Sequence, residues 1–220
     1  MPETTPIRRH FLTSLQAAKA PQQPYRHWLL DRALPLEAAS AIVDLPVRPA
    51  EIDDTHGKRD SHNESRVFFA GDMMADHAVC RDVAACFQAP ETIAALQQAT
   101  GADLAGNYLR IEYCQDKGGF WLEPHTDIGA KKFTMLVYLS TAPDGANWGT
   151  DIYDNEKRHV GRAPAGFDQG LIFVPGNDTW HGFEPRDIRG VRRSIIVNYV
   201  TPEWRARHEL AYPNQPVQAA

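Results

Sequence analysis

The chain has 220 residues and a mass of 24.6 kDa, with 43% hydrophobic and 23% charged residues, the balance of an ordinary globular domain. No apolar run approaches the roughly 18 residues of a membrane helix, and the amino terminus lacks the apolar core of a secretory signal. The formal charge of -5 is spread without long acidic or basic blocks, so neither a membrane nor a nucleic-acid partner is expected.

The three cysteines, Cys80, Cys86 and Cys114, are odd in number and have no CxxC spacing. This pattern indicates free thiols rather than a disulfide framework or a zinc knuckle. Free thiols are typical of a reducing compartment, so we expect a cytoplasmic protein.

We expect one domain over residues 1–220, in which residues 1–103 give mostly helical support with the first strands. The pattern predicts a helix over 8–20, a strand over 25–30, a helix over 36–45, and two helices within 75–100 that are separated near Ala89-Pro90.

Residues 46–65 are polar and rich in turn-forming residues. A loop of this length is uncommon in a compact domain unless it has a function. A lid over the substrate and a plain surface loop are both compatible with this composition.

Residues 104–201 read as a β-core, because β-branched and aromatic runs alternate there with Gly, Pro, Asn and Asp. Leu109, Ile111 and Tyr113 share one apolar face. Both faces of the run 132–140 are apolar, which suits a sheet covered on two sides. Further short strands are expected at 151–154, 158–162, 170–174 and 179–183. The number of strands favours a mainly β fold with flanking helices, a double-stranded β-helix or jelly roll.

The most informative motif is His125-Thr126-Asp127, followed later in the chain by His181. Side chains two apart on a strand share a face, so His125 and Asp127 can bind one metal ion while Thr126 points away. A histidine from a later strand completes a set of two imidazoles and one carboxylate, which holds Fe(II) and leaves coordination positions open. We therefore predict that His125, Asp127 and His181 bind a metal.

A second motif follows His181, where a turn ending at Gly190 leads into a β-branched run. Arg192 and Ser194 share one face of this run and Arg193 lies on the other. A shift of one residue in register would exchange the two faces, so both arginines are candidates for a cationic group near the metal.

Taken in order, these motifs resemble the Fe(II)- and 2-oxoglutarate-dependent dioxygenases, in particular their prolyl-hydroxylase-like branch. The resemblance covers about residues 104 to 201, with a weaker match around Tyr25 to Leu45. The matching segments are Ile111-Glu112-Tyr113, Gly118-Gly119, His125-Thr126-Asp127, the run from Thr134 to Ser140, Gly149-Thr150, His181, and Gly190-Val191-Arg192-Arg193-Ser194.

The resemblance implies Fe(II) on the three ligands, 2-oxoglutarate as cosubstrate and O2 as oxidant. It selects Arg192 for the far carboxylate of the cosubstrate, although the gap from His181 is one residue longer than the commonest family spacing. A guanidinium suits a carboxylate because it binds in a bidentate manner. The resemblance also assigns Tyr138 to that carboxylate and Tyr113 to the iron-bound end of the cosubstrate, and it includes Ser194 and Thr134 in the cosubstrate pocket.

Substrate contacts are expected from five further residues. Trp121 and Glu123 are in phase with His125 if their stretch is a regular strand, although Pro124 can break that phase. The remaining candidates are Asp151 and Tyr153 after the Gly149-Thr150 turn, and Asn198 on the face of Arg192.

The sequence thus predicts a hydroxylase that acts on an unactivated C–H of a small molecule or a peptidyl side chain and releases succinate and CO2. Retention of Asp127 favours hydroxylation over halogenation, since halogenating relatives vacate that position. The alternative is a cupin-type metal-dependent hydrolase or isomerase that uses the same three ligands. Such an enzyme has no need for Arg192.

Overall fold

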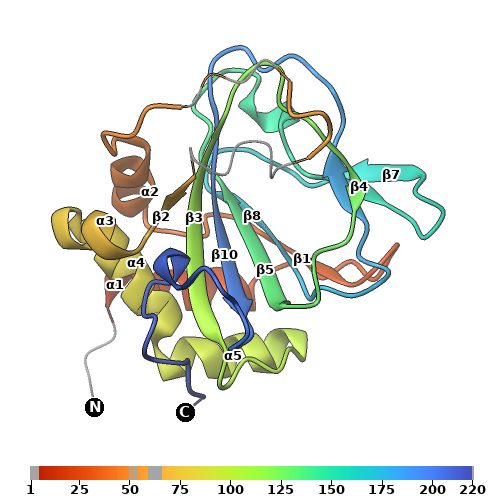
Figure 1. Cartoon of the computed structure of the whole chain (residues 1–220). Coiled ribbons are helices and arrows are strands. Elements are labelled where there is room, and N and C mark those ends of the chain that lie inside the picture. Colours follow the sequence, from red (N-terminus) through yellow and green to blue (C-terminus); the bar gives the residue numbers. More distant parts are fainter. Residues whose placement is uncertain (1–4, 50, 52–53, 59–65, 220) are drawn as a thin grey trace.

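A computed structural model describes residues 5–49, 51, 54–58 and 66–219, and Figure 1 shows its arrangement. The helices are α1 (Pro6–Gln16), α2 (Leu36–Val43), α3 (Gly71–Asp76), α4 (Ala78–Gln88) and α5 (Pro90–Thr100). The strands are β1 (His27–Leu30), β2 (Val67–Phe68), β3 (Tyr108–Asp116), β4 (Leu122–His125), β5 (Lys131–Tyr138), β6 (Asp151–Tyr153), β7 (His159–Arg162), β8 (Gln169–Phe173), β9 (His181–Phe183) and β10 (Arg192–Val200).

The helix boundaries follow local chemistry. Ala89 is extended because the residue before a proline is disfavoured in the helical region, and Pro90 then opens α5 at its first position. Gly101 ends α5 in the left-handed conformation (φ +78°), which glycine adopts without a steric penalty. The predicted break near Ala89-Pro90 is confirmed, and the segment before it contains two helices, α3 and α4.

The strands form two antiparallel sheets. The larger has the order β1-β8-β5-β10-β3-β2 and the smaller the order β4-β9-β6-β7. Neighbouring strands in these sheets are mostly distant in sequence, as when β10 pairs with both β3 and β5. This topology confirms the predicted double-stranded β-helix with flanking helices.

The helices cover one face of the larger sheet, as Figure 1 shows for α1, α4 and α5. The main hydrophobic core lies between these helices and the larger sheet. It joins Phe11 of α1 and Phe87 of α4 to Ile195, Val197 and Tyr199 of β10. The described residues include no helix long and apolar enough to cross a membrane.

The other face of the larger sheet looks into the barrel. Side chains alternate along a strand, so the residues of β10 between those of the main core point inward: Arg192, Ser194, Ile196 and Asn198. Ile196 accordingly packs on a second cluster that includes Leu136, Tyr138 and Ile152. We use "inner face" below for this side of the larger sheet and the facing side of the smaller one.

Candidate active site

His125 and His181 meet in the smaller sheet, where β4 pairs with β9 and the two residues lie opposite each other. Their ring centroids are 4.4 Å apart. The Nδ1 atom of His125 lies 2.8 Å from the carbonyl oxygen of Glu123, and that of His181 lies 2.9 Å from the carbonyl oxygen of Thr179. Since a carbonyl only accepts, each Nδ1 carries a proton, and in the neutral ring Nε2 is then the nitrogen with the lone pair. Both imidazoles therefore have the tautomer that a metal ligand requires.

The charge state of His181 suits the same role. Burial lowers the pKa of His181 to about 4, and the neighbouring His125 acts in the same direction, whereas the carboxylate of Asp127 opposes the shift. The ring is consequently neutral at neutral pH, and only the neutral imidazole binds a metal. The pKa of His181 responds to both other predicted ligands, so the three side chains occupy one neighbourhood.

Asp127 is buried beside these histidines and is held by two donors. The Lys131 ammonium donates to Oδ1 at 2.6 Å, and the Thr134 hydroxyl donates to Oδ2 at 2.7 Å. Burial alone would raise the pKa of Asp127. The charge of Lys131, that of His181 once its ring is protonated at low pH, and the two hydrogen bonds hold this pKa below its ordinary value. Asp127 is thus an ionised carboxylate at neutral pH.

A pocket of about 550 Å³ opens next to Asp127. Its wall is formed by the segment after α5, the turn between β4 and β5 with the start of β5, and the segment after β8. Its charged members are Asp103, Asp127, Lys131 and Lys132. Of the three predicted metal ligands, Asp127 lines this pocket.

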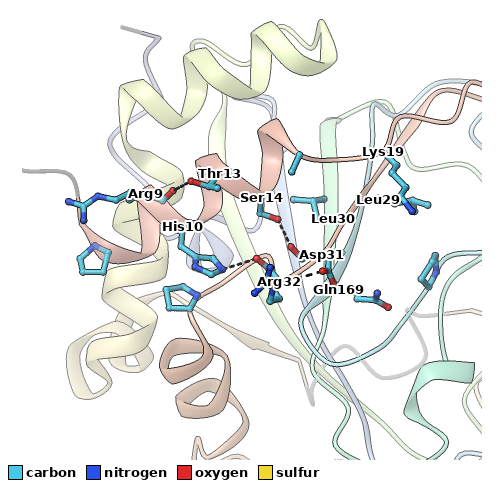
Figure 2. A pocket seen from close by; sticks show the side chains of 15 residues that line it. Arg9, His10, Thr13, Ser14, Lys19, Leu29, Leu30, Asp31, Arg32 and Gln169 are labelled. Carbon is cyan, nitrogen blue, oxygen red and sulfur yellow. Dashed lines mark hydrogen bonds and ion pairs between the residues drawn. The ribbon is translucent and has the colours of Figure 1, made fainter.

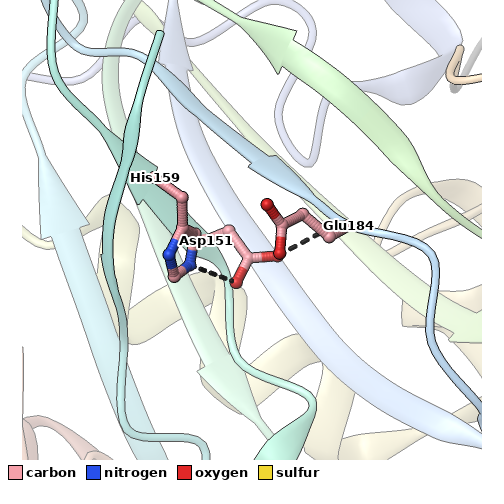
Figure 3. Close-up of side chains that lie close together, drawn as sticks. All are labelled: Asp151, His159 and Glu184. Atoms are coloured by element: carbon pink, nitrogen blue, oxygen red, sulfur yellow. Dashed lines mark hydrogen bonds and ion pairs between the residues drawn. The ribbon is translucent and has the colours of Figure 1, made fainter.

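The three predicted ligands are close but do not form a closed metal cluster. Among the described residues, only Asp151, His159 and Glu184 bring three ligand atoms within 4.8 Å of one another (Figure 3). However, Asp151 already accepts hydrogen bonds from the guanidinium groups of Arg162, at 2.8 Å, and Arg186. Two cations on one carboxylate oppose the binding of a third, so this cluster is better explained as an ion-pair network.

Arg192 lies on the inner face at the start of β10 and is buried. Its Nε donates to the carbonyl oxygen of Trp148 at 2.8 Å, and its Nη1 donates to Asp116. The guanidinium also stacks on the ring of Phe183, 4.7 Å from the centroid. Phe183 and His181 are two positions apart on β9, so their side chains share a face. Arg192 therefore lies on the same side of β9 as His181. Asp116 and Trp148 use only part of its five N–H donors.

Arg193 points the other way. It alternates with Arg192, and its charge acts on Tyr113, which belongs to the core beneath the helices. The structure therefore places Arg192 and not Arg193 on the inner face.

Of three hydroxyl groups on the inner face, one has hydrogen-bond partners in the protein and two have none. The Tyr138 hydroxyl donates to Thr150 Oγ1 at 2.8 Å and accepts from the Thr150 amide at 3.2 Å, while burial raises its pKa. The hydroxyls of Ser194 and Tyr25 are buried without a hydrogen-bond partner in the protein. Ser194 pairs with Tyr138 across β10 and β5, and Tyr25 packs in the same inner cluster as Tyr138. A buried hydroxyl without a partner costs about 1–3 kcal/mol, so an oxygen-rich ligand fits this place.

Trp121 and Glu123 are not directed into the barrel. Between the pairs Leu122–Phe183 and His125–His181, β4 has one residue more than β9, and this bulge changes the phase of the strand. The indole of Trp121 donates to Asp54 at 2.7 Å, and the side chain of Glu123 is exposed. The substrate role predicted for these two residues is therefore not supported by their placement.

This outward side of β4 contacts the described part of the predicted lid. Gly57 has φ +72°, and a Cβ there would lie 2.9 Å from the ring of Trp121, so the two segments pack closely. The remainder of the predicted lid, residues 50, 52–53 and 59–65, lies outside the described residues.

Three other predicted residues also lie away from the cavity. Ile152 packs on the inner cluster, so its neighbours Asp151 and Tyr153 point to the outer side of the smaller sheet. Tyr113 packs in the core beneath the helices, on the face opposite Arg192, so it does not reach the iron-bound end of a cosubstrate. Asn198 does lie on the inner face, as predicted, and hydrogen-bonds to Thr134.

The sequence reading missed Tyr25, Asp116 and Arg110. Tyr25 stands just before β1, at an edge of the larger sheet, where no motif marks it. Arg110 and Asp116 belong to the polar alternate positions of β3. In β3, polar residues recur at every second position of an otherwise apolar strand. This pattern in the sequence indicates that one face of the strand lines a polar barrel interior.

A larger pocket of about 630 Å³ lies outside the barrel, between α1 and β1 (Figure 2). Two of its polar groups are already bound to backbone, since His10 Nε2 lies 2.8 Å from the Arg32 carbonyl oxygen and the Ser14 hydroxyl donates to the Asp31 carbonyl at 2.8 Å. None of the predicted site residues lines it.

No family model matches the chain, and no curated protein is a significant match. Solved structures do match. A prolyl hydroxylase from Trichoplax adhaerens, in complex with a hypoxia inducible factor oxygen degradation domain peptide fragment, is 14% identical with a TM-score of 0.57, over 90% of this chain and 91% of that one.

Two further matches are of the same kind. A prolyl 4-hydroxylase from Phytophthora capsici is 13% identical with a TM-score of 0.60, over 93% of this chain and 68% of that one. The viral collagen prolyl hydroxylase of Paramecium Bursaria Chlorella virus-1, in a 2OG complex, is 13% identical with a TM-score of 0.55, over 80% and 96%. At this identity the likeness shows the fold alone, a double-stranded β-helix.

Proposed function

We propose that this protein is an Fe(II)- and 2-oxoglutarate-dependent dioxygenase that hydroxylates an unactivated C–H bond. The observation that carries the proposal is the pair His125 and His181, each with Nδ1 bound to a carbonyl and Nε2 free, with the ionised Asp127 in the same neighbourhood. The fold supports the proposal, because the three structures described above are prolyl hydroxylases.

In this proposal His125, Asp127 and His181 hold Fe(II), and Arg192, Tyr138, Ser194 and Thr134 form the cosubstrate pocket. Bound Fe(II) and 2-oxoglutarate supply the oxidising chemistry with O2, which yields hydroxylated product, succinate and CO2. The protein's part is to position these reactants. Neutral imidazoles and one carboxylate leave coordination positions open, and an arginine that always carries its charge binds the far carboxylate.

The surroundings of Arg192 would keep water from the cosubstrate end. Phe120, Trp148 and Phe183 form a buried apolar cluster, and the guanidinium lies over the rings of Phe120 and Phe183. An ion pair between Arg192 and a ligand carboxylate is stronger there than in water, because the apolar rings lower the local dielectric constant.

For the substrate we propose a small molecule or a peptidyl side chain that enters through the pocket beside Asp127. Asp103 and Lys132 give its wall charges of both signs, which suits a polar substrate. The Trichoplax prolyl hydroxylase is in complex with a peptide, which supports a peptidyl substrate as one of the two classes. The three buried free cysteines support the cytoplasm as the proposed location.

The test is an anaerobic titration of the purified apo protein with Fe(II) and 2-oxoglutarate. We expect a visible charge-transfer band of the chelate, followed in air by release of succinate that a true substrate stimulates. If a known oxygenase develops the band under the same conditions and this protein does not, the proposal is wrong.

A further inference from the structure

A chain of hydrogen bonds runs behind Asp127 through the barrel interior. The Thr134 hydroxyl donates to Asp127 Oδ2 at 2.7 Å, Asn198 Nδ2 donates to Thr134 Oγ1 at 2.9 Å, and Arg110 Nη1 donates to Asn198 Oδ1 at 3.1 Å. Arg110, Asn198 and Thr134 lie opposite one another on β3, β10 and β5, and Asp127 comes from the turn after β4. The chain therefore connects the predicted metal ligand with the middle of the larger sheet.

The direction of every bond in this chain is fixed by chemistry. Arginine has donors only, so the amide of Asn198 must turn its oxygen toward Arg110 and its NH2 group toward Thr134. The oxygen of Thr134 then accepts from Asn198, and its single proton is available for Asp127. If the direction of any one of these hydrogen bonds were reversed, two donors or two acceptors would face each other in the buried interior. Such a mismatch costs about 1–3 kcal/mol.

The far end of the chain is anchored. Arg110 is 1% exposed and also donates to Glu112 at 2.9 Å and to Glu209 at 2.6 Å. Its guanidinium lies between the rings of Phe68 and Trp204, 4.7 and 5.3 Å from their centroids. Asn198 is 0% exposed and Thr134 is 3% exposed, so water does not compete for these bonds.

We propose that Arg110 and Asn198 are positioning residues for the metal site, which act through Thr134 on Asp127. They keep the Thr134 hydroxyl on Oδ2, so that the plane of the carboxylate is fixed and a metal ion takes Oδ1 in place of the Lys131 ammonium that holds it in this structure. The inference rests on the proposed function, because it takes Asp127 as a metal ligand. It adds two residues to the site and gives each a defined role.

The test measures binding of Co(II), followed by its visible absorption, to the full-length protein and to Thr134→Val, Asn198→Leu and the double variant. Outer partners of metal ligands typically change metal affinity 10- to 100-fold, so each single variant should bind Co(II) at least about tenfold more weakly. The double variant should bind no more weakly than the weaker single variant, because both changes break the same chain. Thr134→Ser keeps the hydroxyl and should keep the wild-type affinity.

Thr92→Val is the matched control, since Thr92 is equally buried but lies on α5, away from the site. The thermal midpoint of each metal-free variant shows that it is folded, and Thr134→Val serves alone if Asn198→Leu does not fold. Additive effects in the double variant, or unchanged affinity in folded Thr134→Val, would overturn the inference while leaving the proposed function intact. A wild-type protein that binds no Co(II) would overturn both.

Discussion

The rings of His125 and His181 lie 4.4 Å apart, and each ring donates its Nδ1 proton to the carbonyl oxygen two residues earlier in the chain. The two histidines thus have the same local arrangement, although they come from strands far apart in the sequence. His27 makes the same contact with the Tyr25 carbonyl, so the feature that sets His125 and His181 apart is their position opposite each other across β4 and β9.

The first prediction tests which of two groups of side chains binds the metal, the predicted ligands that include His181 or the cluster that includes His159. His181→Ala should abolish the charge-transfer band with Fe(II) and 2-oxoglutarate, because it removes one of only three proposed ligands. His159→Ala should leave the band unchanged, since His159 lies in the ion-pair network around Asp151. If His159→Ala loses the band and His181→Ala keeps it, the metal is at the outer cluster and the proposed site is wrong.

The second prediction concerns the cosubstrate carboxylate. Arg192→Lys should weaken binding of 2-oxoglutarate to the Fe(II) protein roughly 10- to 100-fold, because an ammonium cannot replace a bidentate guanidinium. Arg193→Lys makes the same change one position along, on the helix side of the sheet, and should have little effect. Titration of the chelate band gives both affinities, and equal losses in the two variants would contradict the assignment of Arg192.

The third prediction compares two of the tyrosine hydroxyls that are buried without a hydrogen-bond partner in the protein, those of Tyr25 and Tyr113. Tyr25→Phe should leave the metal-free protein as stable as wild type or more stable, because it removes an unsatisfied polar group. It should also lower the affinity for 2-oxoglutarate roughly fivefold, because the ligand loses one hydrogen bond.

Tyr113→Phe is its control, since Tyr113 packs beneath the helices. We expect the same stability effect and no change in ligand affinity. Thermal midpoints with and without 2-oxoglutarate measure both quantities, and an unchanged ligand-induced shift in Tyr25→Phe would show that its hydroxyl does not reach the cosubstrate.

The fold and the inner face of β10 could be predicted because period-two patterning is strong there. Ile195, Val197 and Tyr199 form an uninterrupted apolar set, which must face the helices, so Arg192 is left for the barrel. The choice between Arg192 and Arg193 depends on the register of β10. Because the apolar set is buried beneath the helices, Arg192 and not Arg193 lies on the inner face.

The resemblance assigned Tyr113 to the cosubstrate, and the structure places it elsewhere for a physical reason. In β3 the apolar alternate positions do form one face, as predicted, but that face packs on the helices. The barrel interior takes the polar positions, where Arg110 and Glu112 form buried ion pairs. Sequence alone does not say which face of a sheet covered on both sides is the cavity.

The misplaced substrate residues have a different cause. One extra residue in β4 between Leu122 and His125 shifts the phase, so Trp121 and Glu123 leave the face on which His125 lies. A bulge of this kind depends on the pairing with β9, and nothing local in the sequence reports that pairing.

The last prediction concerns stability and pH. Asp168 is buried, and both its carboxylate oxygens accept from the Leu34 amide, at 3.0 and 3.2 Å. Burial raises the pKa of Asp168 to about 7, with a smaller contribution in the same direction from the negative charge of Asp31. The folded protein therefore binds a proton more tightly than the unfolded chain, whose aspartate titrates near 3.9. The contribution of Asp168 to stability is full below about pH 4, falls as the pH rises, and is lost above about pH 7.

Asp168→Asn removes this titration and keeps the shape, and asparagine tolerates the positive φ of 62° at this position. Its free energy of unfolding, measured with urea from pH 4 to pH 8, should rise steadily relative to wild type up to about pH 7 and then stay constant. Asp187→Asn, at an exposed aspartate, should show no such trend. A constant difference between Asp168→Asn and wild type across this range would mean that the Asp168 carboxyl is already ionised in the folded protein.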